Sequence, residues 1–244
     1  MFKIIILISS ILFFLFSCSK KNVEIEQIDE TDLNTQMITS YKEGIDLLNQ
    51  GNTFDAAKKF TEAEILFPQS LWAPRSALMS SYTYYISGLY EDSISEIKRY
   101  LKTYPLHERR NYAYYLLALS YYEQIVDEKK DLNPLLQAKE NFNIIIKDYP
   151  NSEFATDAEY KLELINEILA SKEMYLARYY LEKEKWIPAI NRFKIILNEY
   201  ERTIYVEEAL HRLVEIHYKL GLVNEAKKYA STLGYNYKSG EWYE

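Results

Sequence analysis

Cysteine, histidine, glycine and proline are all scarce in this sequence of 244 residues. It contains one cysteine, Cys18, together with three histidines, six glycines and six prolines. A single cysteine cannot form an intramolecular disulfide, so stability must come from buried apolar surface. Such surface is plentiful, because 48% of the residues are hydrophobic and 24 residues are tyrosines. Tyrosine suits half-buried helix faces, where the ring packs and the hydroxyl stays in water.

Side-chain groups that could carry chemistry are also missing. The sequence has no phosphate-binding loop, no histidine-glutamate metalloprotease motif and no serine elbow. His211 and His217 differ by about 600° of helix rotation, so they cannot hold a metal as an i, i+4 pair would. The net charge is −7 and no concentrated basic stripe exists, which disfavours nucleic acid as a partner. We therefore expect a binding protein without a cofactor, not an enzyme.

Long hydrophobic runs are absent except at the start of the chain. Lys3 precedes the apolar run Ile4–Phe16. A membrane-spanning helix needs roughly 20 apolar residues, so this run is too short to serve as one. A basic start, a short apolar core and a small residue before the break are typical of a secretory signal peptide. The sequence predicts such a peptide over residues 1–17.

The residues around Cys18 predict a lipid anchor. Leu15 at position −3 and Ser17 at position −1 resemble the lipobox of bacterial lipoproteins. The resemblance implies that Cys18 becomes the mature N-terminus and carries S-diacylglycerol and an N-acyl group. Ser19 stands where lipoproteins of the inner membrane have aspartate, which implies the cell outer membrane, with the body in the periplasm. An ordinary cleaved signal with a chance cysteine is the alternative.

The remaining chain divides into a polar segment and a helical body. Residues 18–37 are polar and lack a continuous apolar stripe, which is typical of a flexible tether. From about residue 38 the apolar residues follow i, i+3, i+4 spacing, as in Ala138–Ile146. Alternation typical of strands is absent. These patterns predict an all-α body.

A repeat becomes visible when the helix ends are aligned. One segment carries the small, aromatic, small and proline positions of a tetratricopeptide second helix, namely Ala56, Phe60, Ala63 and Pro68. The small residue that corresponds to Ala56 recurs at residues 93, 138, 189 and 226. Two of the intervals are too long for an uninterrupted repeat, which places insertions in residues 127–134 and 152–171, the second as a longer helix.

This spacing predicts a right-handed superhelix of about five tetratricopeptide hairpins. Repeats 1–3 occupy residues 38–151, and repeats 4–5 with an aromatic tail occupy residues 152–244. Gly51, Gly88 and Gly221 lie between paired helices, where glycine ends a helix in the left-handed conformation. Stacked hairpins form a groove that is lined mainly by first helices and binds extended peptides or partner helices.

Three long stretches of the sequence resemble one family. They are Asn111–Ile125, Asp148–Ala158, and Val206–Glu215 together with the tail that holds Leu233–Tyr237 and Trp242–Tyr243. With the lipobox, they are similar to the BamD family, the tetratricopeptide lipoproteins of the β-barrel assembly (BAM) complex. The resemblance covers nearly all of residues 18–244. The chain departs from the family at Tyr200–Glu201, where the family often has tyrosine followed by proline, and in its weak second repeat.

The resemblance implies a substrate groove in residues 38–151. Members of the family receive unfolded outer-membrane β-barrel proteins through their C-terminal signal strand. Phe67 matches the position of an aromatic residue that touches substrate, and Arg99 and Lys102 match a basic pair near it. An aromatic ring with cations suits a strand that ends in an aromatic residue with a free carboxylate. From the residues alone, a solvated face explains this basic group equally well.

The resemblance also implies a partner contact in residues 152–244. Members of the family bind the periplasmic POTRA domains of the barrel-forming BamA and join other BAM lipoproteins. Arg192 matches a position that pairs with an acidic group of BamA, and Tyr179 and Lys183 belong to the same region. Arginine suits this role because its fork binds a carboxylate with two hydrogen bonds.

Two other functions compete with this interpretation. The first is another envelope lipoprotein of the same fold, such as a pilotin that escorts a secretin or a cell-division coordinator. The second is a periplasmic enzyme, which the absence of an acid, base or metal cluster disfavours.

Overall fold

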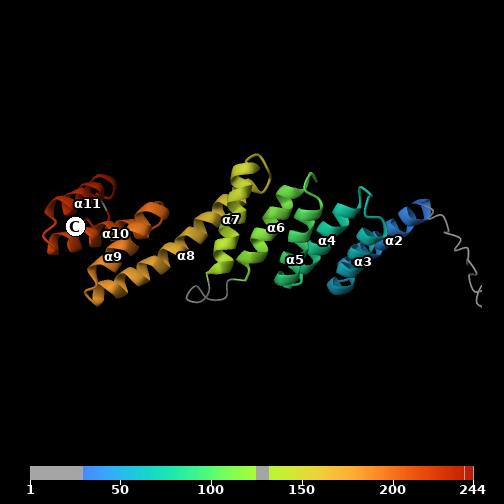
Figure 1. The fold of residues 1–244 in the computed structure, drawn as a ribbon, viewed down its shortest axis with the longest axis horizontal. Coiled ribbons are helices and arrows are strands. Elements are labelled where there is room, and N and C mark those ends of the chain that lie inside the picture. The colour runs from blue at the N-terminus through green and yellow to red at the C-terminus, as the bar shows by residue number, and fades with distance from the viewer. Residues whose placement is uncertain (1–29, 125–131, 239, 244) are drawn as a thin grey trace, which may run out of the picture.

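The computed structural model describes residues 30–124, 132–238 and 240–243, and every regular element within them is a helix (Figure 1). The predicted signal peptide, Cys18 and most of the insertion at 127–134 lie outside the described residues. The helices are α2 (Glu30–Asn49), α3 (Thr53–Leu66), α4 (Ala73–Ile86), α5 (Tyr90–Thr103), α6 (Arg110–Tyr122), α7 (Asn133–Asp148), α8 (Ala155–Glu182), α9 (Trp186–Glu199), α10 (Tyr205–Lys219) and α11 (Val223–Asn236).

Consecutive helices form five hairpins, which follow one another along the long axis of the molecule (Figure 1). We call α2, α4, α6, α8 and α10 the first helices and their partners the second helices. The prediction of an all-α superhelix of tetratricopeptide hairpins is confirmed.

The turns inside the hairpins depend on a left-handed residue. Gly51, Gly88 and Gly221 have φ angles of 78°, 72° and 74°, a conformation in which a side chain is strained. The fourth hairpin uses Glu184 instead, with φ of 54°. Gly51, Gly88 and Gly221 therefore act as predicted, and the fourth turn shows that the same geometry tolerates another residue.

The connections between hairpins also repeat. Phe67, Tyr104 and Tyr149 directly follow their helices with φ of −142°, −119° and −133°, and a proline follows each of them. Tyr200 ends α9 with φ of −133°, the same value as Tyr149, although Glu201 follows it. The backbone turn is therefore kept where the sequence departs from the family pattern.

The core is built from the small and aromatic positions of the repeat. Phe60, Phe142 and Phe193 are fully buried, and each lies in a second helix. In the first hairpin the backbone of α2 lies so close to the Phe60 ring of α3 that a Cβ built on Gly44 would lie 2.8 Å from Cε1 of Phe60. The repeat pattern read from the sequence is thus the packing pattern of the core.

The body begins earlier than predicted, and one of its helices is unusually long. Helix α2 begins at Glu30, so residues 30–37 are helical although they were predicted to belong to the flexible tether. Met37 explains the difference, because its side chain is fully buried and extends the apolar face of α2 by one turn. Residues 155–171 of the predicted insertion at 152–171 belong to α8, which has 28 residues, whereas the other helices have 13 to 20.

The tyrosines of the third hairpin join it to the fourth. Tyr115 stacks on Phe154 with ring centroids 4.8 Å apart, and its hydroxyl donates a hydrogen bond of 2.6 Å to Asp157. Tyr112 also packs on Phe154. Burial raises the pKa of both tyrosines, and in Tyr115 the bond to Asp157 adds to it, so both hydroxyls stay protonated donors. This part of the tyrosine-rich string is a packing surface.

Candidate partner-binding surfaces

An apolar pocket of about 290 Å³ lies at the N-terminal end of the hairpin stack. It is lined by Ile38, Tyr41, Lys42, Ile45, Asp46 and Trp72. Helix α2 supplies all of these residues except Trp72, which precedes α4. The Tyr41 ring meets the rings of Trp72 and Phe60 edge-on, at centroid distances of 5.1 and 5.3 Å. These contacts hold the pocket walls in place.

A cation stands next to this pocket. The guanidinium of Arg75 lies 5.5 Å from the centre of the Trp72 ring, and Arg75 is exposed. Burial raises the pKa of Tyr41, and the charge of Arg75 opposes that rise. Tyr41 therefore keeps its proton at neutral pH and presents a hydroxyl donor. Apolar walls, a phenolic donor and an exposed cation fit an aromatic group that carries a carboxylate.

The predicted substrate residue Arg99 is engaged within the chain. Its guanidinium donates two hydrogen bonds of 2.7 and 2.6 Å to Glu64 and further bonds of 2.8 and 2.9 Å to Glu96. Glu64 is only 5% exposed and also accepts a bond of 2.7 Å from the hydroxyl of Tyr104. The hydrogen bond to Glu64 raises the pKa of Arg99. Arg99 thus joins α3 to α5, and its side chain, 40% exposed, already has two carboxylate partners.

The other two predicted substrate residues are placed differently. Phe67 is half-buried at the end of α3, three residues beyond Glu64, and Lys102 is exposed on α5. The sequence reasoning missed Tyr41, Trp72 and Arg75, which form the pocket described above. A tryptophan directly before a first helix was the signal that could have indicated them.

In the C-terminal region, a second buried glutamate is paired with arginine. Glu208 of α10 is 5% exposed and accepts hydrogen bonds from both Nε and Nη2 of Arg178 on α8, the former at 2.9 Å. Arg212 lies 3.7 Å from the same carboxylate. The hydrogen bond to Glu208 raises the pKa of Arg178. This cluster fastens the first helices of the fourth and fifth hairpins together.

The three predicted partner residues lie on α8 and α9 and in the turn between them. Nη1 of Arg192 on α9 lies 2.9 and 3.2 Å from the carboxylate oxygens of Glu173 on α8, and the arginine side chain is 36% exposed. Tyr179 is 47% exposed and Lys183, directly after α8, is also exposed. Arg192 therefore already has one carboxylate partner, while Tyr179 and Lys183 face solvent together one helical turn apart.

The aromatic tail is docked on the last hairpin. The backbone N–H of Trp242 donates to Glu207 at 2.9 Å, and the Trp242 carbonyl oxygen lies 2.8 Å from Nδ1 of His211. The guanidinium of Arg212 lies 5.0 Å from the centre of the Trp242 ring. The tail therefore covers the N-terminal half of α10.

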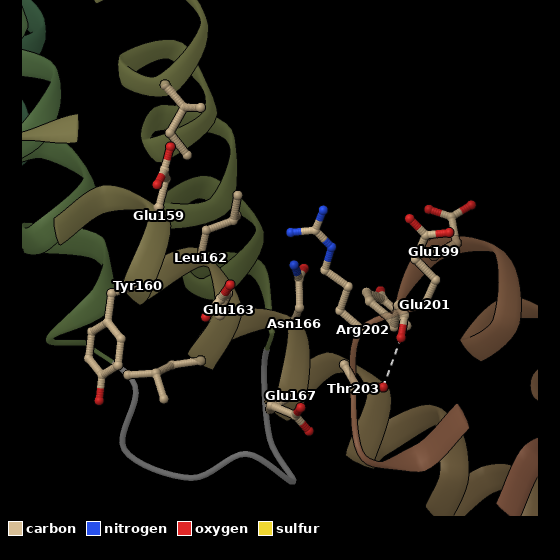
Figure 2. Close-up of a pocket in the computed structure, with 13 residues that line it drawn as sticks. Glu159, Tyr160, Leu162, Glu163, Asn166, Glu167, Glu199, Glu201, Arg202 and Thr203 are labelled. Carbon is tan, nitrogen blue, oxygen red and sulfur yellow. Dashed lines mark hydrogen bonds between the residues drawn. The ribbon is translucent and has the colours of Figure 1, made fainter. Parts of the chain in front are cut away.

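A third surface is a cleft of about 690 Å³ beside the first half of α8 (Figure 2). Residues of α8 form one wall, and the segment from the end of α9 to the start of α10 forms the facing wall. The backbone N–H of Ile204 donates to Glu167 across this junction at 3.2 Å. Glu167 thereby fixes the distance between the two walls.

Two further properties bear on function. Within the described ranges, no group of three or more histidine, cysteine, aspartate or glutamate side chains is placed to hold a metal ion. In the same residues no helix is both long enough and apolar enough to cross a membrane.

Stacked hairpins with open surfaces at both ends define a helical-repeat binding scaffold. The profile of the YfiO family, described as an outer membrane lipoprotein, matches residues 34–233. The chain belongs to this family of outer membrane lipoproteins, and the predicted resemblance to BamD is confirmed.

Two relatives in this family are each named outer membrane protein assembly factor BamD. The protein of Rickettsia prowazekii (strain Madrid E) is 38% identical over 215 residues, which cover 88% of this chain and 86% of the relative. The protein of Caulobacter vibrioides (strain ATCC 19089 / CIP 103742 / CB 15) is 39% identical over 203 residues, which cover 83% and 67%. Both are named as assembly factors and not as enzymes. The crystal structure of MamA protein matches with a TM-score of 0.42 and 18% identity over 82% of this chain and 90% of that one, which is too weak to support an argument.

Proposed function

We propose that this protein is a periplasmic scaffold for the assembly of outer-membrane β-barrel proteins, anchored by a lipid on Cys18. In this role it binds the POTRA domains of BamA, joins other BAM lipoproteins and receives unfolded barrel proteins, without catalysing a reaction. Its family and the names of its relatives support this role. The structural observation that carries the proposal is the apolar pocket of Tyr41 and Trp72 with Arg75 beside it.

The pocket matches the chemistry of a barrel protein's C-terminal signal. The terminal aromatic side chain packs against Tyr41 and Trp72 in the pocket, and the terminal carboxylate faces Arg75. This assignment replaces Arg99 as the carboxylate receptor, because Arg99 is bound to Glu64. Lys102, exposed on α5, remains available for acidic residues upstream in the substrate.

A peptide that ends in phenylalanine with a free carboxylate tests this assignment by fluorescence anisotropy. Trp72→Ala should weaken binding about tenfold, because the aromatic contact is lost. Arg75→Gln and amidation of the peptide should each weaken binding, and their combination should weaken it no further, because both remove the same ion pair. Lys102→Gln is the matched control for the loss of one cation. If Lys102→Gln weakens binding and Arg75→Gln does not, the carboxylate binds at the predicted basic group instead.

The BamA contact is assigned to Tyr179, Lys183 and Arg192. Because Arg192 also pairs with Glu173, a simple charge reversal cannot separate an interface role from an intramolecular one. Arg192→Glu should abolish co-purification with BamA from detergent-solubilised outer membrane. The double change Glu173→Arg with Arg192→Glu restores the intramolecular pair in reverse, and it should still fail to bind. Recovery of BamA in the double variant would assign Arg192 a purely structural role.

The same pulldown distinguishes the competing functions. Recovery of BamA as the main partner supports the proposal, whereas recovery of a secretin or a cell-division enzyme contradicts it. Cys18→Ser should give a folded periplasmic protein that has lost its high local concentration at the membrane. Membrane fractionation and circular dichroism measure these two properties separately.

A further inference from the structure

The cleft beside α8 exists because α8 is about twice as long as most of the other helices. The side chains of Ala155, Ala158 and Ile165 pack into the core that α8 shares with α7. Helix α9 packs on the later part of α8, where Met174 and Ala177 belong to the next core. One face of the first half of α8 is therefore left without a helix against it.

This uncovered face carries both apolar and acidic side chains. Tyr160 is 60% exposed and Leu162 is half-buried in the cleft. The glutamates come from both walls, namely Glu159, Glu163 and Glu167 on α8 and Glu199 and Glu201 opposite. Figure 2 shows these carboxylates on the two sides of the cleft, with the side chain of Arg202 between them.

Most of these carboxylates have no cation of their own. Glu167 accepts the backbone N–H of Ile204. Lys139 is near enough to Glu199 to interact with it electrostatically. Glu159, Glu163 and Glu201 form no ion pair within the part of the chain that the structure describes. The amide oxygen of Asn166, in the same lining, is shielded from solvent and has no hydrogen-bond partner there. Among the described residues that line the cleft, the acceptors on the two walls outnumber the cation Arg202.

We propose that this cleft binds a segment of a partner polypeptide that carries lysine or arginine residues and an apolar side chain. The apolar side chain packs on Leu162, and the cations reach the carboxylates on both walls. A single metal ion does not fit, because no three acidic side chains in the described residues come together to hold one. The occupant must be an extended polycation, since the negative charge is spread along the cleft.

This inference goes beyond the proposed function, because the cleft shares no residue with the aromatic pocket or with Tyr179, Lys183 and Arg192. Failure of one assignment therefore leaves the other intact. The probe is a fluorescein-labelled, amidated peptide of alternating arginine and leucine, and binding to the mature chain is measured by anisotropy at physiological salt.

Three variants give opposite and distinguishable results. Glu163→Gln with Glu199→Gln should weaken binding about tenfold, because one carboxylate is lost from each wall. Arg202→Gln should strengthen binding, because the cation that competes with the peptide is removed. Glu91→Gln with Glu108→Gln removes the same net charge from exposed sites in the N-terminal region and should change binding less than twofold. Equal weakening by both glutamate pairs would show that the peptide responds only to net charge, and would overturn the proposal.

A photocrosslink locates the peptide independently of affinity. A photoreactive residue in place of Leu162 should crosslink to the peptide, and one in place of Leu71, which is 86% exposed far from the cleft, should not. Equal crosslinking from both positions contradicts a specific site. Circular dichroism of each variant establishes that the helices are intact.

Discussion

The N-terminal region (residues 38–151) and the C-terminal region (residues 152–244) each contain a buried glutamate paired with an arginine. The pair joins second helices in the N-terminal region and first helices in the C-terminal region. In the N-terminal region, Glu64 and Arg99 join two second helices, α3 and α5. In the C-terminal region, Glu208 and Arg178 join two first helices, α8 and α10. Both glutamates are 5% exposed, so each needs its arginine to offset the loss of hydration.

The two regions also differ in the side chains that they expose. In the N-terminal region no such clamp joins α2 and α4 among the described side chains, and the pocket of Tyr41 and Trp72 lies beside these helices. In the C-terminal region the first helices are clamped, and the exposed groups Tyr179 and Lys183 lie where α8 ends.

The largest expected effect comes from the core aromatics that the two regions share. Phe193→Ala should lower the free energy of unfolding by about 3–5 kcal/mol, because a fully buried ring is replaced by a cavity. Phe60→Ala removes the equivalent buried ring from the first hairpin, which packs against only one other hairpin. We expect its loss to appear as early unfolding of α2 and α3.

Urea unfolding of single-tryptophan variants measures the two effects separately. Trp72 reports on the N-terminal region, and Trp186 reports on the C-terminal region. Coincident transitions for both probes in Phe60→Ala would contradict independent unfolding of the first hairpin.

Removing one buried glutamate should have the next largest effect. Glu208→Ala leaves Arg178 and Arg212 without their shared acceptor, and Glu64→Ala leaves Arg99 and the Tyr104 hydroxyl without theirs. We expect losses of about 2–3 kcal/mol, below the range for fully buried pairs because the arginines are partly exposed. Thermal unfolding of each single variant gives the loss. The pair Glu208→Leu with Arg178→Leu is the control, because it removes both charges and should recover part of the stability.

A smaller effect is expected where the first hairpin is most tightly packed. Gly44→Ala places a Cβ 2.8 Å from the Phe60 ring, and the gain in helix propensity offsets only part of that strain. The expected net loss is about 1 kcal/mol by urea denaturation. Gly44→Ala in a Phe60→Leu background is the control, since the smaller side chain removes the contact. Unchanged stability in Gly44→Ala alone would mean that the Phe60 ring shifts without cost.

The smallest expected effect is a dependence on pH that originates in the N-terminal region. Burial lowers the pKa of His107, opposed by Glu108 and reinforced by Arg75 and Arg109. Nδ1 of His107 lies 2.6 Å from the Tyr100 hydroxyl. Because the folded pKa lies below the unfolded value of about 6.5, this residue costs no stability above that pH and lowers stability as the pH falls below it. Melting temperatures measured from neutral to mildly acid pH should fall less steeply in His107→Gln than in the wild-type chain.

The sequence by itself determined the local structure. Helix spacing, the left-handed turns at Gly51, Gly88 and Gly221, and the small and aromatic core positions follow from interactions within a few residues. The long α8 could also be predicted, because the interval between two repeat positions is longer than an uninterrupted repeat. The family, too, could be recognised from contiguous strings, because these strings record packing that the repeat requires.

Only the tertiary structure decided which charged groups are open to a partner. Arg99 and Arg192 have the residue type expected of carboxylate receptors, but Glu64 and Glu173 meet them from other helices, 35 and 19 residues away. The pocket at Trp72 and the cleft beside α8 likewise depend on where one helix docks along another. Local spacing does not encode these distances, because they are set by the packing of side chains that are remote in the sequence.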